Sequence, residues 1–237
     1  TQLDDFTSRV EKTHQKRILN SHIIVSLQWF EYDHIDRVKK SYMQLNNQAP
    51  ELIAEFSYND LGKVIVKKLG NNLQKIDYAY NLHGWLTKIN GLDLDNTAAN
   101  DPKDLWGMEL SYNEGFSKKQ FNGNIAGAKW VSARDGEEHA YGYQYDKLSR
   151  LTQADFRTKN EQGAWTTEKG DFTVFGITYD ANGNIQKLNR QGATAKDENG
   201  NYTYGAMDRL RYHYEGNRLL AVDDQVVTDG SGGDFRD

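Results

Sequence analysis

The sequence predicts an all-β fold, a repetitive ribbon of antiparallel β-hairpins. A Tyr-centred motif recurs seven times along the 237 residues, aromatic residues reach 12%, and 21 Gly accompany only 37% hydrophobic residues. This aromatic content is too high for a disordered chain. Few aliphatic residues and many glycines are typical of a thin, turn-rich β structure, rather than of a compact globule with average composition.

Each copy of the motif contains an apolar residue, a polar residue, Tyr, and then Asp, Asn or Glu. This two-residue period places the apolar side chain and the Tyr on one face of a strand. Successive Tyr are between 22 (80−58) and 35 (214−179) residues apart. The seven pairs are Tyr32-Asp33, Tyr58-Asn59, Tyr80-Asn81, Tyr112-Asn113, Tyr145-Asp146, Tyr179-Asp180 and Tyr214-Glu215.

The residues after each Tyr predict a short turn. An Asp or Asn side chain can accept hydrogen bonds from the backbone two residues on. Three copies have glycine at the fourth place, where a tight turn needs a positive φ: Gly62, Gly84 and Gly183. An aliphatic residue follows six places after six of the Tyr: Val38, Val64, Leu86, Leu151, Ile185 and Leu220. Each unit is therefore predicted to be a β-hairpin, with the Tyr112 copy irregular because Gly115 comes one place early.

Four segments depart from the repeat. Residues 5–16 are expected to form a helix or a frayed strand. Residues 90–105 are expected to form a surface loop with a helical turn that ends at Pro102. The polar segments 159–170 and 191–201 are expected to be long hairpin tips. Because binding residues are often found on loops, these segments are the best places for a further function.

Composition excludes several classes of site. The net charge of −5 does not suggest a nucleic-acid-binding surface, and no stretch approaches the roughly 20 apolar residues of a membrane helix. The absence of Cys excludes disulfides, thiolate nucleophiles and Cys-based metal sites. The six His show no metal-ligand spacing. We therefore expect no cofactor, no metal, no nucleic-acid partner and no membrane span.

Two clusters could suggest chemistry, and both are better explained structurally. Residues 137–139, Glu-Glu-His, are the only acid/base cluster in sequence, but neighbouring residues of a strand point to opposite faces. Asp180, Asn182 and Asn184 begin like a calcium loop, but the Gly and Glu that complete such a loop are missing. The sequence therefore predicts a protein that is not an enzyme and has no catalytic residues.

The aromatic residues leave two interpretations open. Repeat-phased Tyr are expected to pack on the sheet, since aromatic cross-strand pairs stabilise antiparallel sheets. The five Trp could instead form stacking platforms for sugars. Trp165 lies in a polar segment and is the only Trp whose context favours exposure, so it is the one residue expected to contact a glycan.

The ordered series of Tyr-Asp and Tyr-Asn units, with Gly and an aliphatic residue behind them, resembles the YD repeats of the RHS family. This family includes polymorphic bacterial toxins, shell components of insecticidal toxin complexes and the extracellular domain of animal teneurins. The resemblance covers about residues 30–223. Residues 78–90, 121–130, 145–152 and 177–185 are similar to RHS proteins of Bacteroidetes-type bacteria.

The resemblance implies that the repeats form a spiralling shell, or β-cocoon, that is secreted or lies on a bacterial cell surface. It divides the chain into a lead-in segment, 1–29, a YD-repeat region, 30–223, and a loop leading to further repeats, 224–237. The expected function is structural: to enclose or present a C-terminal toxin or effector. The expected partner is the remainder of the same chain, while a secretion-channel component and a surface glycan remain open. The alternative function is a cell-surface adhesion or carbohydrate-binding repeat module.

Overall fold

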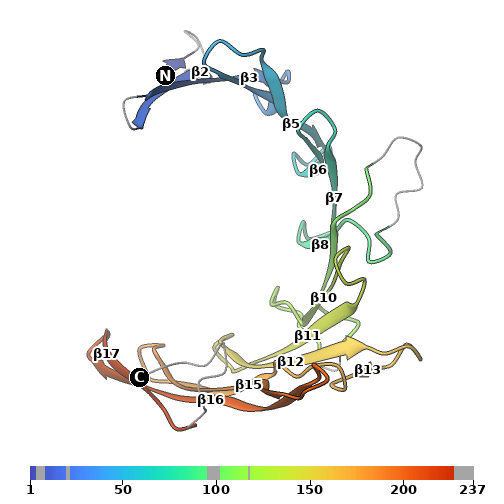
Figure 1. Ribbon diagram of the computed structural model, residues 1–237, viewed down its shortest axis with the longest axis vertical. Coiled ribbons are helices and arrows are strands. Elements are labelled where there is room, and N and C mark those ends of the chain that lie inside the picture. The colour runs from blue at the N-terminus through green and yellow to red at the C-terminus, as the bar shows by residue number, and fades with distance from the viewer. Residues whose placement is uncertain (4–8, 20–21, 95–101, 117, 227–237) are drawn as a thin grey trace. The chain divides into compact units, whose positions relative to one another are not determined.

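The computed structural model describes residues 1–237 except 4–8, 20–21, 95–101, 117 and 227–237 (Figure 1). The described residues form seventeen β-strands and no helix, which confirms the predicted all-β class. Contacts divide the chain into two compact units, residues 1–107 and 108–237. Each unit is described by itself.

In the first unit, each strand pairs antiparallel with its neighbour in sequence, which produces a meander of hairpins. Its strands are β1 (Gln2–Leu3), β2 (Val10–Leu19), β3 (His22–Tyr32), β4 (Val38–Leu45), β5 (Glu51–Tyr58), β6 (Val64–Leu69), β7 (Gln74–Tyr80) and β8 (Leu86–Ile89). Strand β9 (Trp106–Ser111) crosses the boundary between the units.

The second unit continues the same pattern, with β9 paired to β10 and each later strand paired to a chain neighbour. Strand β12 also pairs with β14. Its strands are β10 (Gly127–Ser132), β11 (Glu138–Tyr145), β12 (Leu151–Lys159), β13 (Trp165–Thr166), β14 (Val174–Tyr179), β15 (Ile185–Lys196), β16 (Tyr202–Glu215) and β17 (Arg218–Asp224).

Every hairpin that ends in a motif Tyr shows the same irregularity, a shift of register directly before the Tyr. The Tyr then pairs with the aliphatic residue that opens the return strand. These pairs are Tyr32–Val38, Tyr58–Val64, Tyr80–Leu86, Tyr145–Leu151 and Tyr179–Ile185. The predicted hairpins at these five Tyr are confirmed. At Tyr214 the partner is Leu219 rather than Leu220, because the turn at Gly216 is one residue shorter than expected.

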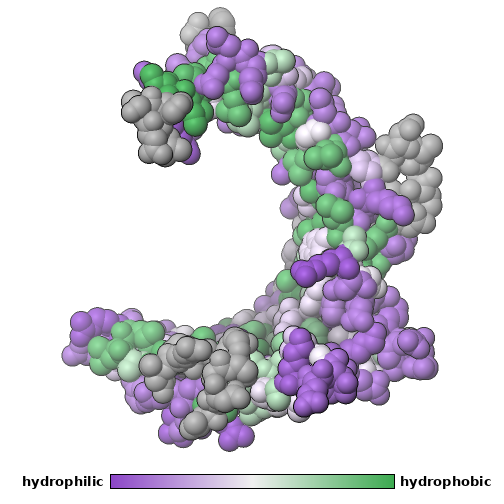
Figure 2. All heavy atoms as spheres, in the orientation of Figure 1, coloured by the Kyte–Doolittle hydropathy of each residue, from purple (hydrophilic) through white to green (hydrophobic). Residues whose placement is uncertain are grey.

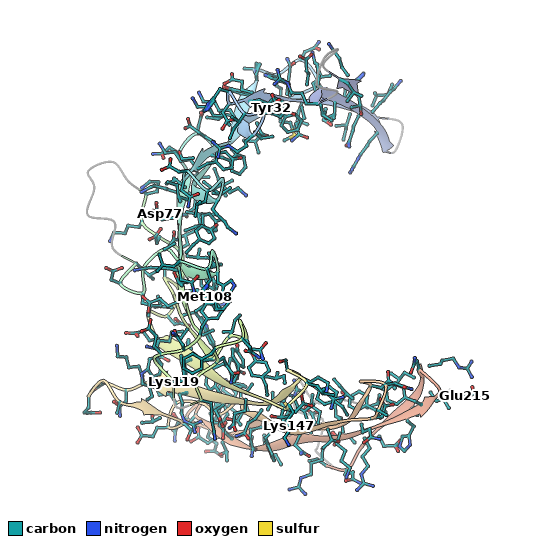
Figure 3. All side chains as sticks on the ribbon, turned by 180° about the vertical axis from the view of Figure 1, so that it is seen from behind. Tyr32, Asp77, Met108, Lys119, Lys147 and Glu215 are labelled. Carbon is teal, nitrogen blue, oxygen red and sulfur yellow. The ribbon has the colours of Figure 1, made fainter. Side chains whose placement is uncertain are left out.

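Few side chains are fully buried, as expected of sheet layers whose side chains project from both faces (Figure 3). In the first unit the buried apolar set contains Ala54, while the second unit holds the others, with Phe156 only 4% exposed. The Phe156 ring contacts Trp130, Tyr141 and Phe172. Hydrophobic and hydrophilic residues are interspersed over each unit (Figure 2).

Three of the segments outside the repeat take a definite form. The described part of residues 5–16 is extended, because β2 begins at Val10; it is a strand and not a helix. The polar tip predicted for residues 191–201 is much shorter than expected, since β15 continues to Lys196. In the segment 159–170, a turn at residues 160–164 is followed by the short strand β13.

Two other predictions fall largely outside the described residues. Most of the loop before Pro102 lies in residues 95–101, and most of the C-terminal loop lies in residues 227–237, neither of which the structure describes. In the part of the chain that the structure describes, no helix has the length and hydropathy needed to cross a membrane.

Candidate functional site

The Asp or Asn after each motif Tyr organises its turn through one side-chain oxygen. Oδ1 of Asp33 accepts hydrogen bonds from the amides of Ile35 and Arg37, at 3.0 Å each. The Asp33 amide also donates to the Arg37 carbonyl at 2.9 Å. The same bonds to residues two and four places on recur at Asn59, Asn81, Asp146 and Asp180. This is the local bonding for which Asp and Asn are favoured in turns.

In the three motif turns that begin with Asp, the residue four places later donates a side-chain hydrogen bond to Oδ2 of the Asp. Arg37 Nε donates to Asp33 Oδ2 and Arg150 Nε to Asp146 Oδ2, both at 2.7 Å. Asn184 Nδ2 donates to Asp180 Oδ2 at 2.8 Å. The motif turns that begin with Asn have Lys63 and Trp85 at this place, and Lys63 lies over the Tyr80 ring instead.

These bonds stabilise the charged carboxylates. Burial by itself raises the pKa of Asp33, but hydrogen bonds from the Arg37 backbone and side chain and from the Ile35 amide outweigh it, and the pKa falls from 3.8 to about 2. The Arg150 amide is the largest cause of the lowered pKa of Asp146. At Asp180 the side-chain amide of Asn184 is the largest cause of the lowered pKa. The side-chain amide of Asn201 likewise lowers the pKa of Asp197, which begins a turn of the same kind outside the motif.

The lowered pKa values predict a loss of stability in acid. A depressed folded-state pKa contributes stability that is fully present above the unfolded value of about 3.9 and is lost as the pH falls through the folded value. We expect Asp33→Asn to be less stable than the parent near neutral pH, and its free energy of unfolding to fall less between about pH 5 and pH 2. Urea unfolding at a series of pH values measures this.

The matched control is Asn81→Ser, which weakens a turn that has no carboxylate at this position. Its loss of stability should be the same at every pH. An Asp33→Asn variant whose acid sensitivity equals that of the parent would contradict the role of the Asp33 carboxylate.

The motif Tyr tie each hairpin to the preceding one through their hydroxyl groups. Tyr58 Oη donates to the Val38 carbonyl at 2.6 Å, Tyr80 Oη to the Val64 carbonyl at 2.9 Å, and Tyr179 Oη to the Leu151 carbonyl at 2.6 Å. The acceptor is each time the residue that opens the return strand of the previous hairpin. Tyr32 donates to the carbonyl of Val10, which opens β2, and Tyr145 to that of Ile125, two residues before β10.

A cation from the preceding turn covers the ring of the same Tyr. The guanidinium of Arg37 lies 4.3 Å from the Tyr58 ring centroid, and that of Arg150 lies 4.5 Å from the Tyr179 ring. Lys63 lies 5.6 Å from the Tyr80 ring. Because Arg37 and Arg150 also bind the turn Asp, each Arg connects the Asp of one hairpin to the Tyr of the next. We call this Asp–Arg–Tyr arrangement, with its Tyr–carbonyl bond, the repeat lock.

The fourth place after Tyr adopts a positive φ whether or not it is glycine. Gly62, Gly84 and Gly183 have φ of 77°, 75° and 89°. Asp36 and Ser149 occupy the same place with φ of 64° and 61°. The predicted requirement for this conformation is confirmed, but glycine is not obligatory.

This conformation predicts opposite effects at two equivalent positions. A Cβ at Gly183 would meet nothing within 4 Å, so the cost of Gly183→Val, about 2 kcal/mol, arises from its backbone conformation alone. Ser149→Gly should instead gain up to about 1 kcal/mol. Thermal unfolding of both variants checks the signs, and a Gly183→Val variant as stable as the parent would show that the turn can relax.

The Tyr112 copy of the repeat does not form the predicted hairpin, and two further turns form without a Tyr before them. Tyr112 is buried, 8% exposed, but Asn113 begins a long connection from β9 to β10 rather than a tight turn. Sequence reasoning missed the turns at Asn160 and Asp197, which have Gly163 and Gly200 at positive φ. Asp197 accepts both side-chain bonds of the motif turns, and Asn160 accepts the one from the amide four places on. Their signal is the Asx-x-x-Gly spacing, which needs no preceding Tyr.

The two clusters that resembled chemical sites serve the fold. Glu137 pairs with Lys169 at 2.7 Å and Glu138 with Lys159 at 2.6 Å, while the ring of His139 stacks on Trp130. Asp180 is occupied by the turn bonds described above. Among the described residues, no group of His, Asp and Glu is arranged to hold a metal ion.

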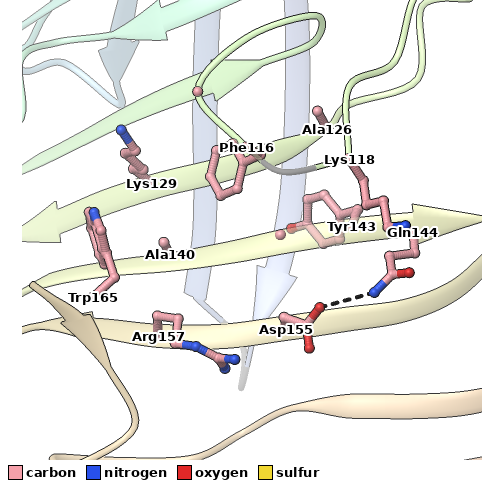
Figure 4. Close-up of a pocket in the computed structure, with 12 residues that line it drawn as sticks. Phe116, Lys118, Ala126, Lys129, Ala140, Tyr143, Gln144, Asp155, Arg157 and Trp165 are labelled. Carbon is pink, nitrogen blue, oxygen red and sulfur yellow. Dashed lines mark hydrogen bonds between the residues drawn. The ribbon is translucent and has the colours of Figure 1, made fainter.

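Trp165 does not have the exposure expected of it. It is half-buried in β13, and Lys129 and Lys159 lie 5.8 and 6.0 Å from its rings. The exposed Trp is Trp106, at 38%. Trp165 instead forms one wall of a cavity of about 270 Å³ in the second unit (Figure 4). Phe116 lies at the same cavity, and sequence reasoning did not connect it to Trp165.

The chain matches no protein-family model, and no curated protein matches its sequence. Solved structures resemble it at low identity. A complex of TcdB2, TccC3 and Cdc42 is 13% identical with a TM-score of 0.44, and the match covers 98% of this chain and 11% of that chain. The Photorhabdus luminescens Tc holotoxin pore with a TccC3 mutation is 10% identical with a TM-score of 0.34, covering 94% of this chain and 16% of the other.

A third structure, TcdB2-TccC3 without its hypervariable C-terminal region, is 11% identical with a TM-score of 0.36, covering 95% of this chain and 16% of that one. The chain thus spans between 11% and 16% of the length of the structures it matches. The partners named in those structures, such as Cdc42, are partners of those proteins.

Proposed function

We propose that this chain is a structural, non-catalytic segment of an RHS/YD-type repeat shell, secreted or on the cell surface, that encloses or presents a C-terminal effector. The observation that carries the proposal is the repeat lock. In it, Tyr58 donates to the Val38 carbonyl and Tyr179 to the Leu151 carbonyl, and each acceptor opens the preceding return strand. In repeat proteins that extend along one direction, each repeat contacts mainly the repeats next to it in the chain.

The use of the motif residues supports a scaffold rather than a chemical site. The carboxylates of Asp33 and Asp146 are engaged with turn amides and with Arg37 and Arg150. General acid–base catalysis needs such groups to converge on a substrate. Here the same groups hold the turns and cover the next Tyr.

Among the described residues, strand β17 pairs only with β16, and its other side supports further pairing with the remainder of the chain. Leu219 and Leu220 are 49% and 57% exposed on this strand. An edge strand with exposed apolar side chains is a template for pairing with another strand. We propose that further repeats of the same protein pair here. A secretion-channel component is the alternative occupant.

Limited proteolysis of the intact parent protein tests enclosure. The C-terminal effector should resist a protease in the parent protein, and should be cleaved at least about tenfold faster when Tyr58→Ala and Tyr179→Ala together weaken two repeat locks. Tyr202→Ala, at a 53% exposed Tyr, is the matched control and should leave the cleavage rate unchanged. An effector that is digested in the parent protein as fast as the free peptide would rule out enclosure.

A carbohydrate-binding module is the second candidate function. The cavity between Phe116 and Trp165 favours it, since aromatic side chains with a few polar groups are typical of small-ligand sites.

A further inference from the structure

The floor of the cavity is formed by β11, where the small side chain of Ala140 lies between Lys129 of β10 and Arg157 of β12. Lys129 of β10 pairs with Ala140 of β11, and Ala140 pairs with Arg157 of β12. Directly paired residues point to the same face of a sheet. Lys129 and Arg157 therefore rise on either side of Ala140, on strands separated by two spacings or roughly 10 Å. Gly142, also on this face of β11, leaves room for the Phe116 ring, which a Cβ there would approach to 3.2 Å.

Aromatic side chains from two distant segments close the cavity. Phe116, from the connection after β9, lies over β10 and β11, and Trp165 comes from β13 (Figure 4). The Lys129 ammonium lies between these walls, 5.9 Å from the Phe116 ring centroid and 5.8 Å from that of Trp165. The cavity therefore offers ring faces beside a positive charge.

Cations outnumber carboxylates at the cavity, since Lys118, Lys129 and Arg157 line it together with one carboxylate. Within the described residues, neither Lys129 nor Arg157 forms an ion pair with a carboxylate; Arg157 donates to the Phe156 carbonyl. The one carboxylate at the cavity, Asp155, accepts hydrogen bonds from Gln144 at 3.2 Å and Gln153 at 2.8 Å. A chain with a net charge of −5 thus gathers three cations and a single carboxylate around one cavity.

We propose that this cavity binds an acidic saccharide through a uronic acid residue or a sugar of the same chemistry. The sugar carboxylate binds between Lys129 and Arg157, because charge-assisted hydrogen bonds are the strongest that these side chains form. The apolar C–H face of the sugar ring packs on Trp165 or Phe116, and its hydroxyl groups donate to Asp155. The proposal deepens the carbohydrate-binding candidate and is independent of the shell.

Size and charge favour a sugar over an acidic peptide. A volume of about 270 Å³ is at the lower end for ligand sites and suits one sugar ring. Asp155 would repel a second carboxylate, whereas a sugar hydroxyl group can donate to it. A uronic acid combines a carboxylate, hydroxyl groups and an apolar ring face in one residue, and the cavity presents a partner for each.

Isothermal titration of the 237-residue chain with trigalacturonate, maltotriose and hexaglutamate tests the proposal. We expect trigalacturonate to bind with a Kd at or below about 1 mM, at least about tenfold tighter than the other two ligands. Trp165→Ala and Arg157→Gln should each weaken binding about tenfold. Trp106→Ala, at the exposed Trp, is the matched control and should bind like the parent.

Ala140→Leu, which fills the floor without changing the charge, should abolish binding while the far-ultraviolet circular dichroism stays that of the parent. Arg157→Lys, which keeps the charge and loses the planar guanidinium, provides a variant that does not depend on the fold of β11; it should bind more tightly than Arg157→Gln. Equal binding of hexaglutamate would assign the cavity to acidic peptides, and equal binding of maltotriose would remove the role of the cations. Either result, or no binding of trigalacturonate at about 5 mM, overturns the proposal, while the proteolysis result for the shell would be unaffected.

Discussion

Tyr179→Ala is expected to lower the free energy of unfolding by about 3 kcal/mol, at the lower end for truncation of a large aromatic side chain, because Tyr179 is half-buried. The substitution removes two contacts of the repeat lock and one contact within the hairpin of Tyr179. These are the hydrogen bond to the Leu151 carbonyl at 2.6 Å, the Arg150 guanidinium 4.5 Å from the ring, and the cross-strand pair with Ile185. Urea unfolding, followed by circular dichroism, measures the loss.

Two further variants separate the contributions. Tyr179→Phe keeps the ring and loses only the hydroxyl group, so it should cost about 1 kcal/mol. Tyr202→Ala removes a Tyr that is 53% exposed, although Lys196 lies 4.9 Å from its ring, and should cost less than about 1 kcal/mol. A Tyr179→Ala variant no less stable than Tyr202→Ala would contradict the repeat lock.

The hairpins could be predicted because their determinants are local. The period of two before each Tyr, the Asp or Asn behind it and the positive φ at the fourth place all lie within seven residues. The same locality explains the turns that were missed, since the search began from Tyr and the turns at Asn160 and Asp197 follow Lys159 and Lys196. A search for Asx-x-x-Gly would have found both.

The repeat lock could be predicted only in part. The position of Arg37 or Arg150 is visible in the sequence, but its two partners lie in different hairpins, and the Tyr contact depends on how successive hairpins pack. The spacing between repeats varies from 22 to 35 residues. The sequence therefore does not reveal which carbonyl the Tyr58 or Tyr179 hydroxyl group meets.

The cavity could not be predicted from the sequence, because its walls come from residues far apart in the chain and its floor from residues with small side chains. Phe116 and Trp165 are 49 residues apart (165−116), and Ala140 and Gly142 between them have no chemistry that would mark a site. The polar context of Trp165 suggested an exposed platform. The two Lys near its ring explain why it is half-buried instead.

The second large effect is expected at Gly127, where there is no room for a side chain. Gly127 pairs with Gly142 across β10 and β11, and the Phe116 ring covers both. A Cβ at Gly127 would lie 2.4 to 2.5 Å from three atoms of this ring. Gly127→Val must therefore displace Phe116, and we expect a loss of about 3 kcal/mol or more in the free energy of unfolding, the sum of overpacking and lost aromatic burial.

A double-mutant cycle makes this prediction specific to the contact with Phe116. With Phe116→Ala already present, Gly127→Ala should cost at least about 1 kcal/mol less than in the parent, because residues in direct contact show coupling energies of this size. Gly205→Ala is the control, since a Cβ there would meet Thr194 at an ordinary 3.6 Å and Gly205 has no positive φ; it should change stability by no more than about 1 kcal/mol. Additive losses in the cycle would mean that Phe116 does not occupy the space above Gly127, and the aromatic wall of the cavity would then be wrong as well.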